Sequence, residues 1–303
     1  MTRFLSHTSP LRSIYAMLCA VALFSVMDSC MKLLSSTYPA MQVAALRALT
    51  SLPLVLLYVG WCGAFGGLLR VRWPLHLLRG ALGIAMLFLF AFGISTLSLA
   101  EAYTIFFIAP ALITALSVLW LKERVDGARW AAIAVGLAGV LVVLRPSGAG
   151  MLTLGGLAVL GAAAMYAVSA ISARLLARTD RSEHMVLWLI VIVALGAGAL
   201  AAPHWVAVRA ADTGLLAALA VSGFLGQLAI TEAFGYGEAS KVAPFEYTAL
   251  AFAVGFDWLL WNTLPDRVTV LGAAIIIGSG LYLIRHERGN QADRHSLAET
   301  EHP

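Results

Sequence analysis

Long hydrophobic runs separated by short polar breaks extend along almost the whole chain. An α-helix needs about 20 apolar residues to cross the hydrocarbon core of a bilayer, and most of the runs have roughly that length. The pattern predicts ten membrane-spanning helices and therefore an all-α integral membrane protein. The predicted helices cover residues 13–34, 40–61, 75–97, 102–121 and 130–144 in the first half, and 152–176, 185–202, 213–235, 242–261 and 268–284 in the second.

The polar break at the midpoint of the chain, Arg145-Pro-Ser-Gly148, has the composition of a turn. It separates a first five-helix repeat, residues 13–145, from a second, residues 152–285. A short segment, residues 1–12, precedes the first repeat, and a polar tail, residues 286–303, follows the second. The charged composition of the tail predicts disorder from Arg285 onward.

A similar motif occurs once in each half, as LAEAYTIFFIAP at 99–110 and as YGEASKVAPFEY at 236–247. In both copies Glu-Ala interrupts one hydrophobic run, and Ala-Pro lies inside the next. This similarity indicates a duplication. Because five helices per half is an odd number, the two repeats enter the membrane from opposite sides. Such inverted repeats typically hold a substrate near the midplane of the bilayer and permit alternating access.

Pro110 and Pro244 are the prolines of the two motif copies. A proline inside a helix removes a backbone hydrogen bond and weakens the helix locally. We therefore predict that both prolines are hinges in moving helices. The alternative interpretation is a static kink.

The composition excludes an ordinary soluble protein. The chain is 61% hydrophobic and 12% charged, and its mean hydropathy is +0.88, whereas soluble domains contain about 25% charged residues. The net charge of +4 is spread over the loops. We interpret this charge as a determinant of membrane topology, and not as a nucleic-acid-binding surface.

Lysine and arginine residues are more numerous in the predicted loops on one side of the membrane than in those on the other. The positive-inside rule places that side in the cytoplasm, and both termini with it. The residues on that side are Arg3, Arg12, Arg70, Arg72, Arg79, Lys122, Arg124, Arg129, Arg174, Arg178, Arg181, Lys241, Arg285, Arg288 and Arg294; the opposite side has Arg145, Arg209 and Arg267.

Several sequence features resemble the drug/metabolite transporter superfamily, specifically its EamA-type members. They are the ten-helix duplication, the Asp28-x-x-x-Lys32 pattern, Arg47, and the run LWLKERV at 119–125. The resemblance implies a multi-pass protein of the bacterial inner membrane that moves a small metabolite by alternating access. Members of this group export amino acids and related metabolites, or take up compounds such as S-adenosylmethionine or riboflavin.

One feature departs from the family pattern. The family often repeats the acid corresponding to Glu123 at the end of the ninth helix, but that region here reads WNTLPDR at 261–267. We therefore interpret Glu123 as a residue that structures its loop, and not as half of a symmetric pair.

Asp28, Lys32 and Arg47 are charged residues inside predicted helices, where each costs at least ~2.5 to 3.5 kcal/mol at mid-helix. Asp28 and Lys32 are one helical turn apart and share a face. The three residues are predicted to form an extracellular gate or to bind a zwitterionic or anionic substrate. Alternatively, Lys32 and Arg47 extend to the lipid headgroups while Asp28 neutralises one of them.

Further candidates lie in the other predicted helices. Asp257 and Asp28 are candidates for proton coupling, for which an internal ion pair is the alternative. An aromatic-walled cavity with a few polar groups suits a flat or amphipathic metabolite, although ordinary packing explains such residues equally well. The candidates for this cavity or gate are Phe88, Phe92, Tyr103, Tyr166, Gln227, Glu246 and Tyr247.

No catalytic or nucleotide-binding motif occurs in the chain, and its histidines lie in loops, helix ends or tails. We therefore expect no enzyme activity, cofactor, metal, nucleotide or nucleic-acid partner. The predicted function is secondary transport of an amino acid or amino-acid derivative, in the export direction. Uptake of S-adenosylmethionine or riboflavin is one alternative, and a membrane anchor that binds a partner without transport is another. The expected partners are a small-molecule substrate and the lipid bilayer; the oligomeric state is not predicted.

Overall fold

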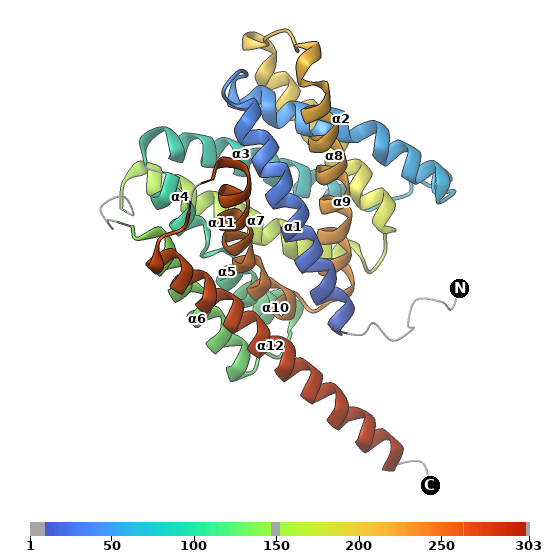
Figure 1. Cartoon of the computed structure of the whole chain (residues 1–303). Coiled ribbons are helices and arrows are strands. Elements are labelled where there is room, and N and C mark those ends of the chain that lie inside the picture. The colour runs from blue at the N-terminus through green and yellow to red at the C-terminus, as the bar shows by residue number, and fades with distance from the viewer. Residues whose placement is uncertain (1–9, 98, 147–151, 263, 301–303) are drawn as a thin grey trace.

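The computed structural model describes residues 10–97, 99–146, 152–262 and 264–300, and these form a bundle of helices (Figure 1). In the described residues no strand is present, as the hydrophobic runs predicted. The long helices are α1 (Pro10–Leu34), α2 (Ala40–Trp61), α3 (Trp73–Thr96), α6 (Gly127–Leu144), α7 (Leu154–Leu176), α8 (Ser182–Ala201), α9 (Thr213–Tyr236) and α12 (Arg267–Thr300).

Two of the predicted segments are interrupted. The segment predicted at 102–121 consists of α4 (Leu99–Phe106), α5 (Ala109–Leu116) and the π-helical turn η1 (Ser117–Leu121). The one predicted at 242–261 consists of α10 (Ala239–Val242), the 3₁₀ segment η4 (Ala243–Tyr247) and α11 (Thr248–Trp261). Nine stretches of the described residues are long and apolar enough to span a membrane. The last interrupted segment is not among them, so the count of ten remains a prediction.

Pro110 and Pro244 lie at these interruptions. Each is in the first turn of the element that follows the break, α5 for Pro110 and η4 for Pro244. At this position the missing proline N–H removes no intrahelical hydrogen bond, so the proline marks where the new element begins. Both side chains are buried. Bending at these positions remains a prediction.

Helix packing follows the two-repeat organisation. The most extensive contacts join α1 to α9, α3 to α7, α6 to α12 and α2 to α8. If α1 is exchanged with α7, α2 with α8, α3 with α9 and α6 with α12, this set of contacts maps onto itself. Each of the four pairs therefore joins one repeat to the other.

The main hydrophobic core lies where α1, α7, α9 and η4 meet. It includes the fully buried side chains of Met17, Ile171 and Phe245 together with Phe234, which is 3% exposed. Packing of this kind holds the second repeat's interrupted segment against both repeats.

Gly139 of α6 and Gly272 of α12 allow a close approach between these two helices. A Cβ atom added at Gly272 would lie 2.9 Å from the backbone oxygen of Gly139. A Cβ atom added at Gly139 would lie 3.1 Å from the backbone oxygen of Gly272. Small residues that bring backbones together are a common basis of helix association in membranes.

The Gly272→Ala variant is therefore expected to be less stable than the wild type, by roughly 1–3 kcal/mol, because the helices must separate to accept the methyl group. Gly278→Ala is the matched control, since nothing lies within 4 Å of a Cβ atom at that position of the same helix. Thermal unfolding of the purified protein in detergent measures the difference. Equal unfolding temperatures for the two variants would contradict the close contact.

A buried ion network connects the first turn of α6 and the short helix α10 to α12. Arg129, which is 6% exposed, contacts Glu287 at 3.0 Å and Glu238 at 3.2 Å. Lys241 lies 3.0 Å from Glu238 and 3.6 Å from Glu287, whose exposure is 2%. A buried charge is tolerated when it is paired in this way. Glu238 is the more exposed member, with 38% of its side chain accessible. We call Arg129, Glu238, Lys241 and Glu287 the buried ion network.

The structure differs from the predicted disordered tail, and the buried ion network lies where the difference begins. The tail was predicted from Arg285 onward, but α12 continues as helix to Thr300 and extends past the rest of the bundle (Figure 1). Glu287 is buried against Arg129 of α6. The charged Glu287 therefore belongs to an internal ion pair. Composition alone does not distinguish such a residue from one in a solvated tail.

Glu123 and Asp126 join the same region from the loop before α6. The Glu123 carboxylate accepts hydrogen bonds from the backbone N–H groups of Ala239 and Ser240, both at 3.0 Å. Burial alone would raise the pKa of Asp126, but hydrogen bonds from His286 and from the backbone of Arg129 lower it below its usual value. Glu123 thus holds the first turn of α10 in the other repeat.

Candidate functional site

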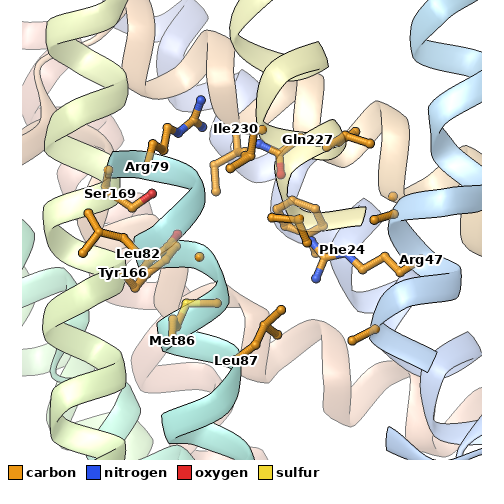
Figure 2. A pocket seen from close by; sticks show the side chains of 18 of the residues that line it. Phe24, Arg47, Arg79, Leu82, Met86, Leu87, Tyr166, Ser169, Gln227 and Ile230 are labelled. Carbon is orange, nitrogen blue, oxygen red and sulfur yellow. The ribbon is translucent and has the colours of Figure 1, made fainter. Parts of the chain in front are cut away.

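A cavity of about 330 Å³ lies between the two repeats. Residues of α1, α2, α3 and α4 from the first repeat and of α7, α8 and α9 from the second form its wall (Figure 2). Its volume is at the lower end of the range usual for small-molecule sites. Most of the wall is apolar, and the polar exceptions are Asp28, Arg47, Ser51, Arg79, Tyr166, Ser169 and Gln227.

Asp28 of α1 and Arg47 of α2 occupy one side of the cavity. The Asp28 side chain is exposed although it belongs to a membrane-spanning helix, because it faces the cavity. Arg47 lies over the ring of Phe24, 5.6 Å from its centroid, in a cation–π contact. The opposite charges attract each other, but the structure places them beyond direct ion-pair contact. Both charges therefore remain available to a bound molecule.

Arg79 of α3 is a cavity residue that sequence reasoning missed. Its position near the end of a predicted helix led to its assignment among the cytoplasmic loop charges. The structure instead buries it to 5% exposure in the second turn of α3, within a membrane-spanning stretch. The sequence did contain a signal for this burial, since apolar residues flank Arg79 on both sides: Leu77, Leu78 and Ala81.

The guanidinium group of Arg79 is incompletely bonded. Its Nε and Nη1 atoms are buried and have no hydrogen-bond partner among the described residues. The side chain extends toward the part of the cavity that Gln227 and Ile230 of α9 line (Figure 2). Buried hydrogen-bond donors without partners are rare in native proteins and indicate a missing partner.

Tyr166 of α7 connects the cavity to the interrupted segment of the second repeat. Its hydroxyl group donates a 2.9 Å hydrogen bond to Oε1 of Glu246. Glu246 belongs to η4, two residues after Pro244. Glu246 itself does not line the cavity, so Tyr166 is its link to that space.

Four of the sequence-predicted residues thus come together around one cavity: Asp28, Arg47, Tyr166 and Gln227. Gln227 of α9 donates a 3.4 Å hydrogen bond to Thr231 one turn later in the same helix. Its amide faces the cavity opposite α7 (Figure 2). The four residues come from α1, α2, α7 and α9, so both repeats contribute.

The other predicted residues do not line this cavity. Lys32 is exposed in the last turn of α1. Phe88 and Phe92 on α3 are 57% and 44% exposed. Tyr103 packs beside Phe90 with ring centroids 5.6 Å apart.

Tyr247 and Asp257 lie in the second interrupted segment. Tyr247 is fully buried, and its ring fits against Gly136 of α6, where a Cβ atom would come within 2.5 Å of it. Its hydroxyl group has no hydrogen-bond partner in the described structure. Asp257 belongs to α11, but its side chain lies outside the described residues, so its proposed role in proton coupling remains a prediction.

Two cations and one anion make up the charge of the cavity wall: Arg47, Arg79 and Asp28. Such a set can hold carboxylate groups and an ammonium group while the apolar wall accommodates a hydrocarbon portion. Within the described residues, no group of three or more His, Cys, Asp or Glu side chains could hold a metal ion.

Comparison with protein families gives a match over nearly the whole chain. The model of the EamA-like transporter family matches residues 11–145 and, separately, residues 153–285. The two matched ranges correspond to the two halves that the sequence motifs and the helix packing define.

Similar characterised proteins are bacterial transporters. A pseudopaline exporter of Pseudomonas aeruginosa is 28% identical over 88% of this chain and 93% of its own. A riboflavin transporter of Vibrio cholerae is 28% identical over 95% of this chain and 98% of its own. An S-adenosylmethionine uptake transporter of Rickettsia prowazekii is 25% identical over 89% of this chain and 92% of its own.

A solved crystal structure has a similar fold, with a TM-score of 0.80 over 93% of this chain and 99% of the other. The two sequences are 18% identical. This similarity concerns the arrangement of the helices alone.

Proposed function

Because the chain belongs to the EamA-like transporter family, we propose that it is a secondary transporter that moves a small organic metabolite by alternating access between inverted repeats. The family and the similar proteins are transporters and not enzymes, and they support a small-molecule substrate and a multi-pass membrane protein. The observation that carries the proposal is the charged cavity, to which both repeats contribute. A rearrangement of one repeat against the other changes access to such a cavity.

The proposed substrate is an amino acid or an amino-acid derivative, moved in the export direction. Arg47 would bind the α-carboxylate and Asp28 the α-ammonium group, because opposite charges on neighbouring walls complement a zwitterion. An exporter among the similar proteins supports this direction. The riboflavin and S-adenosylmethionine carriers support uptake of one of those compounds as the alternative.

The proposed location is the bacterial inner membrane, with both termini in the cytoplasm. The distribution of lysine and arginine supports this orientation. Proton coupling through Asp28 or Asp257 is part of the same proposal, since an intramembrane carboxylate that alternates between two compartments can carry a proton.

Counterflow into liposomes containing the purified protein is the direct test. Vesicles are loaded with one unlabelled compound, and uptake of its labelled form is followed at two internal pH values. The panel contains labelled amino acids, riboflavin and S-adenosylmethionine. We expect accumulation of at least one amino acid over protein-free vesicles. Accumulation of riboflavin or S-adenosylmethionine alone would contradict the amino-acid assignment, and no accumulation of any compound would favour a non-transporting anchor.

A further inference from the structure

A site that binds only a zwitterion leaves the buried Arg79 without a partner. Asp28 and Arg47 already complement one carboxylate and one ammonium group. Removing a guanidinium from water without giving it partners is costly. Among the described residues, no carboxylate lies within ion-pair distance of Arg79, and two of its nitrogen atoms have no hydrogen-bond acceptor.

The position of Arg79 separates it from the zwitterion site. Arg79, Tyr166 and Ser169 lie on one side of the cavity, and Phe24 and Arg47 lie on another (Figure 2). Apart from Asp28, Ser51 and Gln227, the rest of the cavity wall is apolar, with Leu82, Met86, Leu87, Phe106, Val193 and Ile230 among its residues.

The chemistry around Arg79 favours an external acceptor. Tyr166 donates its proton to Glu246, and its oxygen accepts no hydrogen bond from Nε or Nη1 of Arg79. Ser169 offers a hydroxyl group beside the same part of the cavity (Figure 2). A planar guanidinium with parallel N–H donors matches the two oxygen atoms of a carboxylate better than it matches a spherical ion.

We propose that Arg79 binds a second carboxylate of the transported molecule. The substrate class is then an α-amino acid that carries a further carboxylate at the end of an apolar chain. Its zwitterionic end lies between Asp28 and Arg47, its chain contacts the apolar wall, and its distal carboxylate reaches Arg79. This inference rests on the proposed function and adds a specific end group to its substrate.

Binding of matched compounds by the purified full-length protein tests the proposal. The probes are 2-aminoadipate, 2-aminopimelate and 2-aminosuberate, each paired with the amino acid of equal chain length that ends in a methyl group. We expect the wild type to bind at least one diacid roughly 10- to 100-fold more tightly than its methyl partner, the usual size of a charge-assisted contact. Isothermal titration calorimetry measures both affinities.

The Arg79→Gln variant should lose this preference, while its affinity for the methyl compounds stays within about twofold of wild type, since the zwitterion site is intact. Arg79→Lys, which keeps the charge but not the planar fork, should restore part of the preference. Arg70→Gln is the control, because Arg70 is an exposed loop residue. Equal wild-type affinities for every diacid and its partner, or an unchanged preference in Arg79→Gln, would overturn the proposal.

Thermal unfolding without ligand distinguishes binding from a structural role. Arg79→Gln should raise the unfolding temperature of the empty protein, because it removes a buried charge without partners. A lower temperature would indicate that Arg79 stabilises the fold and would count against the proposal. Inorganic anions give a further control. If chloride or phosphate stabilises the wild type but not Arg79→Gln, and no diacid does so, Arg79 binds a small anion and the proposal is wrong.

The same measurements separate this inference from the proposed function. If the wild type accumulates amino acids in counterflow but shows no preference for a distal carboxylate, only the role of Arg79 is wrong. If it neither accumulates nor binds any amino acid, this inference and the amino-acid assignment of the proposed function are both wrong.

Discussion

Replacing Arg47 with glutamine is expected to reduce counterflow of the transported amino acid at least about tenfold, because the substrate carboxylate loses a charged hydrogen-bond donor. The substitution also leaves Asp28 without its neighbouring cation in the cavity. An anionic group facing a bound carboxylate repels it, so the two effects act in the same direction. Initial rates of labelled amino-acid uptake, normalised to the protein in the liposomes, measure the loss.

Lys32→Gln is the matched control for this experiment. Lys32 and Arg47 are both cations of predicted membrane helices, but only Arg47 lines the cavity. We expect Lys32→Gln to transport at close to the wild-type rate. Equal losses in both variants would favour the gate that the sequence suggested for the two residues together, and normal transport by Arg47→Gln would show that the proposed site is wrong.

Replacing Arg129 with methionine is expected to destabilise the protein by about 3 kcal/mol or more, because it breaks a buried ion pair and leaves excess negative charge. Among the described residues, Glu287 would retain only Lys241, at 3.6 Å. Glu238 would lose one of its two cations. The unfolding temperature in detergent and the amount of protein recovered from membranes report the effect.

Two further variants test whether burial of the ion pair causes the loss of stability. The double variant Arg129→Met/Glu287→Met should recover much of the lost stability, since the unpaired carboxylate is removed together with its partner. Arg145→Gln should remain close to wild type, although it breaks an ion pair with Asp266, because both of those side chains are about half exposed. Equal destabilisation by Arg129→Met and Arg145→Gln would mean that burial is not the cause.

The sequence predicted the helical fold well because membrane helices follow hydrophobic length. The observed bounds of α2, Ala40–Trp61, equal the predicted ones, and most others differ by a few residues. The interruption within 239–261 was less predictable. Pro244 and the Ala-Pro repeat marked its position, but the 3₁₀ geometry of η4 depends on packing against α1, α5 and α6.

The composition of the cavity was only partly predictable, because helix rotation decides which face of a span is internal. Asp28 and Arg47 were recognisable because charge inside a membrane is costly. Phe88 and Phe92 share a face of α3, but that face is exposed. Arg79 was assigned to a loop since positive charges near helix ends usually are loop residues. Its burial depends on α7 and α8, which no single-helix pattern describes.

The buried ion network restricts how the two halves can be recombined. Arg129 comes from the first repeat, whereas Glu238, Lys241 and Glu287 come from the second. A homodimer made from the first half alone would leave Arg129 without these carboxylates. A homodimer made from the second half alone would leave the carboxylates without Arg129. The duplicated halves have thus become complementary, like the subunits of an obligate heterodimer. When the halves are expressed as separate chains, membrane-inserted protein should accumulate only when both are present.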